Sequence, residues 1–366
     1  MELKIFNREL ELLGVIDAFT SLIWTRRYYK SGEFELHIPP TDDNIKLLKI
    51  ENIIYKGGNE AGYIAQRELS LNDNGEEALV VKGFFMTNYL GRRINWTRII
   101  MTGSIENIMR RLVSDNIIKP TDEKRKISSI ELGSLNNLAK KTEYQNSFDN
   151  IIDCLELLAQ EAEYGFGLFF DITNKKLKFN VYEGIDRTIN QEVNPPVIFS
   201  RTFENIYSQN QTISIENYRN TCLIAGAGED ENRKMTAINE TDGLDRYELF
   251  VDARDLSDTE TVDGVEKEIP WSRYEMLLIQ RGSEKLSEYQ LSNVFESKVN
   301  QTGNFVYKVD FDLGDIVTCH DHLWGVTLDT RITEIEEVYE GNKTEINVTF
   351  GNNVPTLIDK IKAKMR

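Results

Sequence analysis

A cysteine, two histidines and an aspartate stand together in the segment Cys319-His320-Asp321-His322. Side chains of these types ligate zinc, and on a β-strand His320 and His322 would point to the same side, where two imidazoles can share one ion. Cys319 and Asp321 would point the other way, and His37 lies far off in the sequence. Because a third ligand is missing, we favour the alternative interpretation, which places these residues at the tip of a β-hairpin.

Two further segments are candidates for ligand binding. Asp310, Asp312 and Asp315 are spaced like the oxygen ligands of calcium, but the glycine and the distal glutamate of a helix-flanked calcium loop are missing. A solvated strand end is the expectation there. The Gly-Ala-Gly segment at 226–228 is neither a complete G-x-G-x-x-G fingerprint nor followed by a convincing helix, so no nucleotide site is expected.

Hydrolytic motifs are missing from the sequence. It contains no G-x-S-x-G elbow, no H-E-x-x-H motif and no glycine-rich phosphate loop that ends in Lys-Ser or Lys-Thr. The two carboxylates of a glycosidase can lie far apart in a sequence, so a pair among the 60 acidic residues is an open alternative without identified positions. We predict that the protein is not an enzyme and has no catalytic residue, no metal site and no cofactor.

Composition and charge restrict the class of protein. With 366 residues and 40% hydrophobic content, the chain can bury a sizeable core and form about two to four domains. Its 43 basic and 60 acidic residues give a net charge of -17, which argues against binding to nucleic-acid phosphates or anionic membranes. The three scattered cysteines indicate buried apolar side chains rather than disulfides. We expect no secretion signal and no transmembrane helix.

Alternating apolar and polar residues predict β-strands in the first hundred residues. Residues 24–29 and 34–39 flank one plausible hairpin turn. Residues 63–71 and 77–85 flank a second turn at 72–75, where Asn and Gly tolerate the positive φ that a tight turn requires. The opening region is therefore expected to form an antiparallel sheet or barrel.

Helical periodicity follows this β-rich region. Apolar residues recur at helical spacing after Ser104, whose side chain is placed to cap the first turn. A second helix is predicted from Ser147, with Phe148 on its apolar stripe and Gly165 as its stop. The two helices and the hairpin after them predict a small α/β unit.

The last third of the chain returns to strand patterns. The acidic stretch at 256–270 is expected to be an exposed loop, and helical character runs from about residue 272 to 292. Strands follow between residues 305 and 350, and Pro355 opens a short amphipathic helix.

Six segments form a wider pattern that spans nearly the whole chain. They are Trp24–Pro39, Gly83–Arg93, Tyr218–Arg233 with Gly243–Leu256, and Asp310–Cys319 running into residues 331–352. In their order and spacing these segments resemble the hub proteins at the tip of long-tailed phage tails. In siphoviruses such hubs often form the N-terminal part of tail-associated lysins.

The resemblance implies an α+β, β-rich fold with two tail-tube-like β-barrel domains and intervening α/β domains. It implies a homotrimer, in which three copies of two barrels form a pseudo-sixfold ring that matches the hexameric tail tube. The implied partners are the tail tube and distal tail proteins, the tape-measure protein, and a tip, receptor-binding or lytic protein. Lysin activity is not expected, because no peptidase or glycosidase extension follows the matching segments.

The expected function is that of a structural hub at the distal end of a phage, prophage or phage-tail-like tail, assembled in the bacterial cytoplasm. DNA would pass through its lumen without specific binding; the acidic charge either repels the DNA or serves solubility alone. The alternatives are a tail-associated cell-wall hydrolase and a carbohydrate-binding adhesin, although the four tryptophans are scattered. The predicted domains are a tube-like β domain (1–100), an α/β domain (101–198), return strands with the acidic loop and a helical segment (199–304), and a C-terminal β domain with a short terminal helix (305–366).

Overall fold

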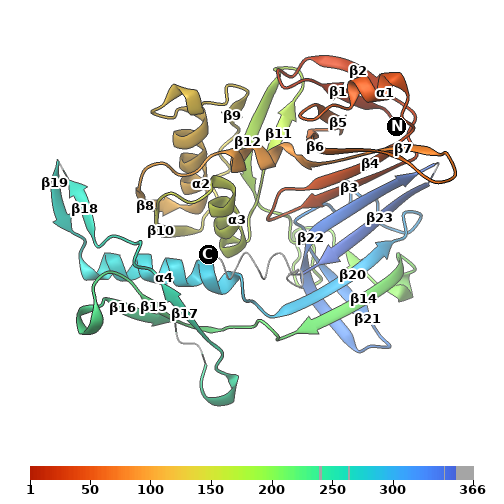
Figure 1. Cartoon of the computed structure of the whole chain (residues 1–366). Coiled ribbons are helices and arrows are strands. Elements are labelled where there is room, and N and C mark those ends of the chain that lie inside the picture. Colours follow the sequence, from red (N-terminus) through yellow and green to blue (C-terminus); the bar gives the residue numbers. More distant parts are fainter. Residues whose placement is uncertain (239–240, 263, 342, 352–366) are drawn as a thin grey trace.

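The structure is a computed structural model that describes residues 1–238, 241–262, 264–341 and 343–351. The fold is α+β and rich in strands, as predicted, with one large sheet and four small ones (Figure 1). None of the described sheets closes into a barrel, so the two predicted barrels are not confirmed. The terminal helix predicted from Pro355 lies outside the described residues.

A thirteen-stranded sheet connects the beginning of the chain with its end. The strands are β1 (Leu3–Phe6), β2 (Leu12–Ile16), β3 (Ser21–Arg27), β4 (Glu33–Ile38), β5 (Ile53–Gly57), β6 (Glu60–Leu71), β7 (Glu77–Phe85), β13 (Ile198–Phe199), β14 (Ile206–Ser214), β20 (Ser292–Val299), β21 (Ile316–Asp321), β22 (Val326–Glu340) and β23 (Lys343–Phe350). Their order is β14-β20-β23-β22-β3-β4-β7-β6-β5-β1-β2, and β13 and β21 extend the sheet beside the first half of β22. The antiparallel pair β22–β3 therefore joins the two ends of the chain in one sheet.

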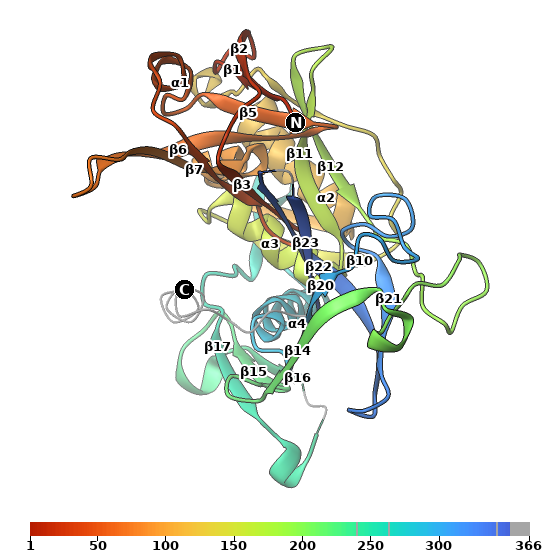
Figure 2. The same ribbon diagram turned by 90° about the vertical axis from the view of Figure 1, so that its right-hand side faces the viewer.

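The remaining elements form smaller units beside this sheet (Figures 1 and 2). Two small sheets have two strands each: β8 (Ile99–Ser104) with β10 (Lys141–Asn146), and β18 (Thr259–Val262) with β19 (Val265–Glu268). Two have three strands each. One has β12 (Lys176–Tyr182) between β11 (Gly165–Asp171) and β9 (Ile130–Leu132), and the other has β15 (Thr221–Ala225) between β16 (Met235–Ile238) and β17 (Glu248–Asp252). The α-helices are α1 (Asp42–Leu47), α2 (Ile105–Val113), α3 (Ile151–Ala162) and α4 (Trp271–Ser287). Short 3-10 helices are η1 (Met86–Arg92), η3 (Glu123–Arg125), η4 (Arg201–Phe203), η5 (Asp230–Asn232) and η6 (Gly243–Asp245), and η2 (Ser114–Ile118) is a single π-helical turn. Within the described ranges, no helix combines the length and the apolar content that crossing a bilayer requires.

Several local predictions are confirmed. Both predicted N-terminal hairpins are present, as β3–β4 and β6–β7, and Gly75 in the second turn has a φ of 79°. Ser104 caps α2, because its Oγ accepts a hydrogen bond from the amide of Asn107 at 3.3 Å. The three cysteines are buried and unpaired, as expected.

The start and the end of α3 differ from the prediction. Phe148 is not part of the helix, because it has a φ of 68° and its side chain is 69% exposed. Asn150 caps the helix instead, and its Oδ1 accepts a hydrogen bond from the amide of Ile152 at 3.1 Å. Glu163 rather than Gly165 takes the left-handed position that ends the helix, with a φ of 56°. The prediction used apolar periodicity alone and therefore placed the start of the helix before Asn150, the polar residue that caps it.

The acidic stretch at 256–270 was wrongly predicted to be an irregular loop. It contains the antiparallel hairpin β18–β19, in which Thr259 pairs with Glu268 and Val262 with Val265. Acidic residues are unfavourable in strands on average, but an exposed two-stranded ribbon keeps their carboxylates in water. The predicted helix at 272–292 is shorter than expected, because α4 ends at Ser287 and β20 begins at Ser292.

Four buried apolar clusters stabilise these units. The largest joins α2, α3, β11 and β12 with side chains from β1, β5 and β6, so the α/β part packs directly on the large sheet. A second lies within the N-terminal strands, where the ring of Trp24 stacks on Phe34 with centroids 5.6 Å apart. A third fills the C-terminal strands, and the fourth lies between α4 and the sheet β16-β15-β17.

Gly83 of β7 is a position where only glycine fits. A Cβ atom there would overlap the carbonyl oxygen of Tyr63 and would lie 2.6 Å from the ring of Phe34. We therefore expect Gly83→Ala to lower the free energy of unfolding by about 3 kcal/mol, because the buried core cannot absorb the extra atom. Chemical denaturation would measure this loss. Gly103→Ala is the control, because no atom lies within 4 Å of a Cβ at that strand position, and an equal loss in both variants would contradict the prediction.

Candidate functional site

The cysteine and histidine segment is the end of the hairpin β21–β22, as predicted. The two strands pair from Ile316 to Asp321, and His322 lies exposed in the turn. Cys319 and Asp321 are buried, whereas the Nδ1 of His320 lies 2.9 Å from the Oγ1 of Thr327 on the neighbouring strand. In the part of the chain that the structure describes, no three His, Cys, Asp or Glu side chains gather as metal ligands do.

Asp321 shapes this hairpin end. Its carboxylate accepts hydrogen bonds from the amide of Trp324 at 2.8 Å, from the Nε of Arg201 at 2.6 Å and from the side chain of Gln209. Burial alone would raise the pKa of Asp321, but these donors outweigh burial and lower the pKa to about 2. The carboxylate is therefore ionised at neutral pH and fixes η4 and β14 to the turn.

The three aspartates of the suspected calcium segment are engaged in protein contacts. Asp315 is buried, and its carboxylate accepts hydrogen bonds from the amide of Ile185 at 2.8 Å and from the Nε of Arg187 at 3.0 Å. The predicted solvated strand end is therefore wrong for Asp315. Asp310 accepts a hydrogen bond from a nearby backbone amide, and Asp312 pairs with an arginine of β3. These oxygens stabilise loops.

The Gly-Ala-Gly segment at 226–228 forms a turn after β15. The amide of Gly226 donates to the carbonyl of Lys234 at 2.9 Å, and the amide of Ala227 donates to the hydroxyl of Tyr274 at 2.8 Å. The segment leads into the single turn η5 rather than a long helix. The amides of Gly226 and Ala227 thus donate hydrogen bonds within the protein.

A buried charge network lies where the N-terminal and C-terminal strands of the large sheet meet. Arg26 of β3 forms an ion pair with Glu60 of β6, and its Nη1 lies 2.5 Å from the Oδ1 of Asp312. The same Nη1 donates to the hydroxyl of Tyr307 at 2.7 Å. The indole of Trp24 donates to Glu60 at 3.2 Å. Arg26 therefore connects three segments that are distant in the sequence.

Glu337 of β22 is the second centre of this network. Its side chain is 2% exposed and contacts Lys56 of β5, Lys308 at 3.3 Å, and the hydroxyls of Tyr307 at 3.0 Å and of Tyr339. Burial alone would raise the pKa of Glu337, but the two lysines outweigh burial and lower it to about 2. Burial lowers the pKa of Lys56, and the Glu337 carboxylate opposes that change. Charges of both signs are thus satisfied inside the protein.

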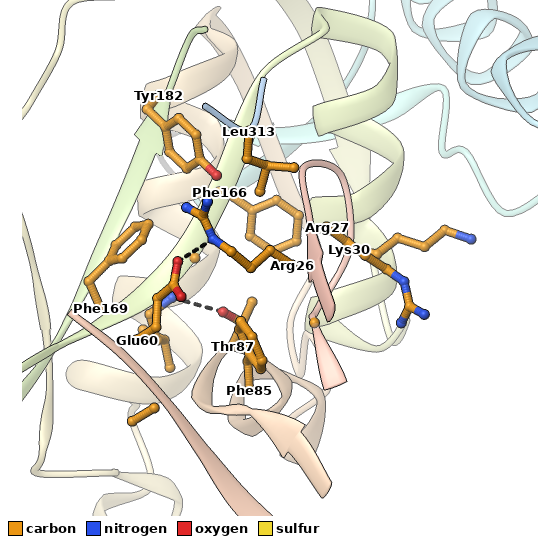
Figure 3. A pocket seen from close by; sticks show the side chains of 14 residues that line it. Arg26, Arg27, Lys30, Glu60, Phe85, Thr87, Phe166, Phe169, Tyr182 and Leu313 are labelled. Carbon is orange, nitrogen blue, oxygen red and sulfur yellow. Dashed lines mark hydrogen bonds and ion pairs between the residues drawn. The ribbon is translucent and has the colours of Figure 1, made fainter. Parts of the chain in front are cut away.

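A small cavity adjoins the network beside Arg26 (Figure 3). Its volume is about 40 Å³, and its walls include Glu60, Phe166, Tyr182 and Leu313. The guanidinium of Arg26 points between these side chains toward Glu60 (Figure 3). Binding pockets for organic ligands are usually about 300 Å³ or larger. The cavity therefore has room for a few water molecules at most. The charged side chains around it link the N-terminal strands of the large sheet to its C-terminal strands.

The network was not predicted from the sequence, although a signal existed. Arg26 stands two residues after the buried Trp24, and Glu337 stands two residues after the buried Ile335. Residues two apart on a strand point to the same face. A charged residue in phase with buried neighbours therefore indicates an internal ion pair, but the sequence does not reveal its partners.

The model of the family described as "Siphovirus ReqiPepy6 Gp37-like protein" matches residues 2–352. None of the curated proteins matches the chain.

Solved structures of tail proteins share the fold. The 43 kDa tail protein of prophage MuSo2 from Shewanella oneidensis has a TM-score of 0.57 at 12% identity, over 96% of this chain and 98% of that chain. A tail protein from Neisseria meningitidis MC58 has a TM-score of 0.58 at 13% identity, over 96% of each chain. The prophage tail protein gp18 from Listeria monocytogenes EGD-e has a TM-score of 0.55 at 13% identity, over 100% and 98%. At these identities the likeness establishes a common fold alone.

Proposed function

The chain belongs to the Siphovirus ReqiPepy6 Gp37-like protein family, and from this membership we propose that it is a structural hub at the distal end of a phage or prophage tail. Membership confirms the resemblance to siphovirus tail proteins that the sequence predicted. In this proposal three copies form a ring that joins the hexameric tail tube to the tip, receptor-binding or lytic components. The ring acts through its shape, without catalysis.

The observation that carries this proposal is a run of eight strands with two open ends. The run is β14-β20-β23-β22-β3-β4-β7-β6, and each neighbouring pair in it is antiparallel. In the described residues β14 pairs only with β20, and the outer half of β6, residues 66–71, pairs only with β7. Because the number of strands is even, joining β14 of one copy to β6 of the next keeps every contact antiparallel.

The composition of the open strands supports this contact. The nine residues of β14 include no charged residue, in a chain of which 28% is charged. Tyr207 and Ile213 on β14 are 63% and 61% exposed, and Leu69 and Leu71 on β6 are 52% and 67% exposed. Soluble proteins usually protect a free edge with charges, prolines or bulges. The outer half of β6 carries Arg67 and Glu68, whereas the β14 edge has no charge and exposes two apolar side chains, so β14 is suited to being covered by another copy of the chain.

The run also divides into two similar halves, which supports a match to sixfold symmetry. The strands β3, β4, β7 and β6 come from the N-terminal region, and β22, β23, β20 and β14 come from the C-terminal half. Three copies would present six such four-stranded units around one axis. In this proposal the two expected tube-like barrels form from these units in the assembled ring.

The proposal also names the surroundings of the ring. The protein would lie in the tail of a virion or phage-tail-like particle, after assembly in the bacterial cytoplasm. Its neighbours would be the tail tube, distal tail and tape-measure proteins, together with a tip, receptor-binding or lytic protein. DNA would pass through the lumen, where acidic side chains would keep it from binding.

The mass of the purified protein in solution tests the proposal. We expect light scattering after size-exclusion chromatography to give three times the mass of the 42.3 kDa chain, with ring-shaped particles in electron micrographs. A monomer at high concentration that also forms no ring with tube proteins present would refute the hub. A monomer that clears peptidoglycan suspensions would support the alternative of a cell-wall hydrolase.

A further inference from the structure

A basic cleft is lined by residues of the β1–β2 loop and the β11–β12 turn, among others. These two parts of the chain lie near each other at the top of both ribbon views (Figures 1 and 2). The cleft is open to solvent and has a volume of about 630 Å³. Its walls come from the β1–β2 loop, the end of η1, the segment 126–129 before β9, and residues 175–176 at the start of β12. Four parts of the chain that are distant in the sequence thus form one concave surface.

The charge of this cleft is opposite to that of the protein. Six basic residues and one acidic residue, Glu9, line it, whereas the whole chain has 43 basic and 60 acidic residues. The basic residues are Arg8, Arg92, Arg93, Lys126, Lys175 and Lys176. Holding like charges together is unfavourable unless counter-charges are near. The cleft is therefore a positively charged region on a protein whose net charge is -17.

The protein supplies only part of the counter-charge. Glu51 lies 2.8 Å from the Nη2 of Arg92 and 3.5 Å from the Nε of Arg8. The Nε of Arg93 donates to the carbonyl of Arg125 at 2.7 Å, and the Nζ of Lys176 donates to the carbonyl of Ser128 at 2.8 Å. Both acceptors are neutral.

In the ranges that the structure describes, Arg93, Lys175 and Lys176 have no ion pair with a carboxylate. Their positive charges are therefore available to an anion from outside the protein.

Several features hold the walls in place before any ligand binds. The guanidinium of Arg92 stacks on the ring of Tyr89 with its central carbon 3.8 Å from the centroid. Leu10 is buried and fixes the β1–β2 loop with a φ of 60°. Lys175 has a φ of 53°, in the left-handed region that favours glycine. A wall fixed in advance loses little entropy when it binds a ligand.

We propose that this cleft binds a phosphate-bearing polyanion through Arg93, Lys175 and Lys176. Guanidinium groups pair with the oxygens of phosphate in a fixed geometry, and lysines add charge without constraining direction. Ser128 and Ser129 also line the cleft and carry hydroxyl groups that can donate to oxygen. Only Leu10, Tyr89 and Ile127 give the walls apolar surface, so an acidic peptide would find few places for its apolar side chains.

Calorimetry with two polyanions tests this assignment. Inorganic tripolyphosphate carries phosphate oxygens, and tricarballylate carries three carboxylates at comparable spacing. We expect the full-length protein to bind tripolyphosphate at low salt and to bind it more weakly as salt rises. Lys175→Gln with Lys176→Gln should weaken binding by about tenfold, and Arg93→Gln by a similar factor.

The matched control is Lys140→Gln with Lys141→Gln, a pair of adjacent lysines that does not line the cleft. It should leave the affinity for tripolyphosphate unchanged, and all variants should retain the unfolding curve of the original chain. Absence of binding, an equal loss in the control, or equal affinity for tricarballylate would each overturn the proposal. These measurements do not depend on assembly, so they are separate from the test of the ring.

Discussion

Replacing Glu337 by alanine should lower the free energy of unfolding by about 3–5 kcal/mol, because the variant leaves Lys56 buried without its carboxylate. The side chain of Lys56 is 6% exposed, so water cannot replace the lost partner. Urea denaturation followed by circular dichroism would measure the change. Glu340→Ala is the control on the same strand, because Glu340 is exposed, and it should change stability by less than about 0.5 kcal/mol.

The pH dependence of stability provides a second measurement for Glu337. Its pKa is about 2 in the folded protein, below its ordinary value of 4.5. A lowered pKa stabilises the fold above pH 4.5, and this contribution is lost as the pH falls toward 2. For this shift the contribution is about 3 kcal/mol.

Two results would contradict this interpretation. The first is an alanine variant that loses stability equally at all pH values. The second is a double variant, Lys56→Met with Glu337→Leu, that is no more stable than Glu337→Ala alone, since a pair of apolar residues should restore much of the loss.

Changing Ile213 to lysine should convert the proposed trimer into a folded monomer. Ile213 lies on β14 and is 61% exposed, so lysine costs the isolated chain little. In the assembled ring the same lysine would bring a charge to the uncharged β14 edge and weaken association by about 2–4 kcal/mol. Light scattering over a range of concentrations would follow this shift.

A second substitution and a control make this test specific. Leu69→Lys lies at the other proposed contact, on β6, and should produce the same monomer. Leu244→Lys introduces the same charge at a residue that is 98% exposed on η6, outside the large sheet, and should leave the trimer intact. If Ile213→Lys and Leu69→Lys both remain trimeric, copies of the chain meet through another surface.

The sequence predicted the elements that depend on local signals. The turn at 72–75 gave the hairpin β6–β7, because Asn and Gly there specify a tight turn. The start of α3 was missed, because Phe148 fitted the apolar stripe while the cap Asn150 determined the first turn. Pairing between β3 and β22 has no local signal, so the continuity of the large sheet emerged only from the structure.

The sites were less predictable than the fold because they also depend on contacts between distant parts of the chain. The residues with the most reactive side chains, Cys319 to His322, proved to be a hairpin end. The basic cleft draws Arg93, Lys126 and Lys176 from three short basic segments in separate parts of the chain, and the sequence does not show that these segments meet. Net charge is a sum over the whole chain, and it does not show where the basic residues lie close together in the structure.

The pairing of β3 with β22 also has a consequence for how the chain is made. About 300 residues separate Ser21 from Glu340, its partner in the register. At about 5–20 residues per second, a ribosome needs roughly 15–60 seconds to deliver that partner. During this time the edge of β3 that will pair with β22 has no partner strand in the nascent chain, so it can mispair with other polypeptides. Completion of synthesis, rather than the arrival of neighbouring subunits, is thus the earliest moment at which a competent protomer exists.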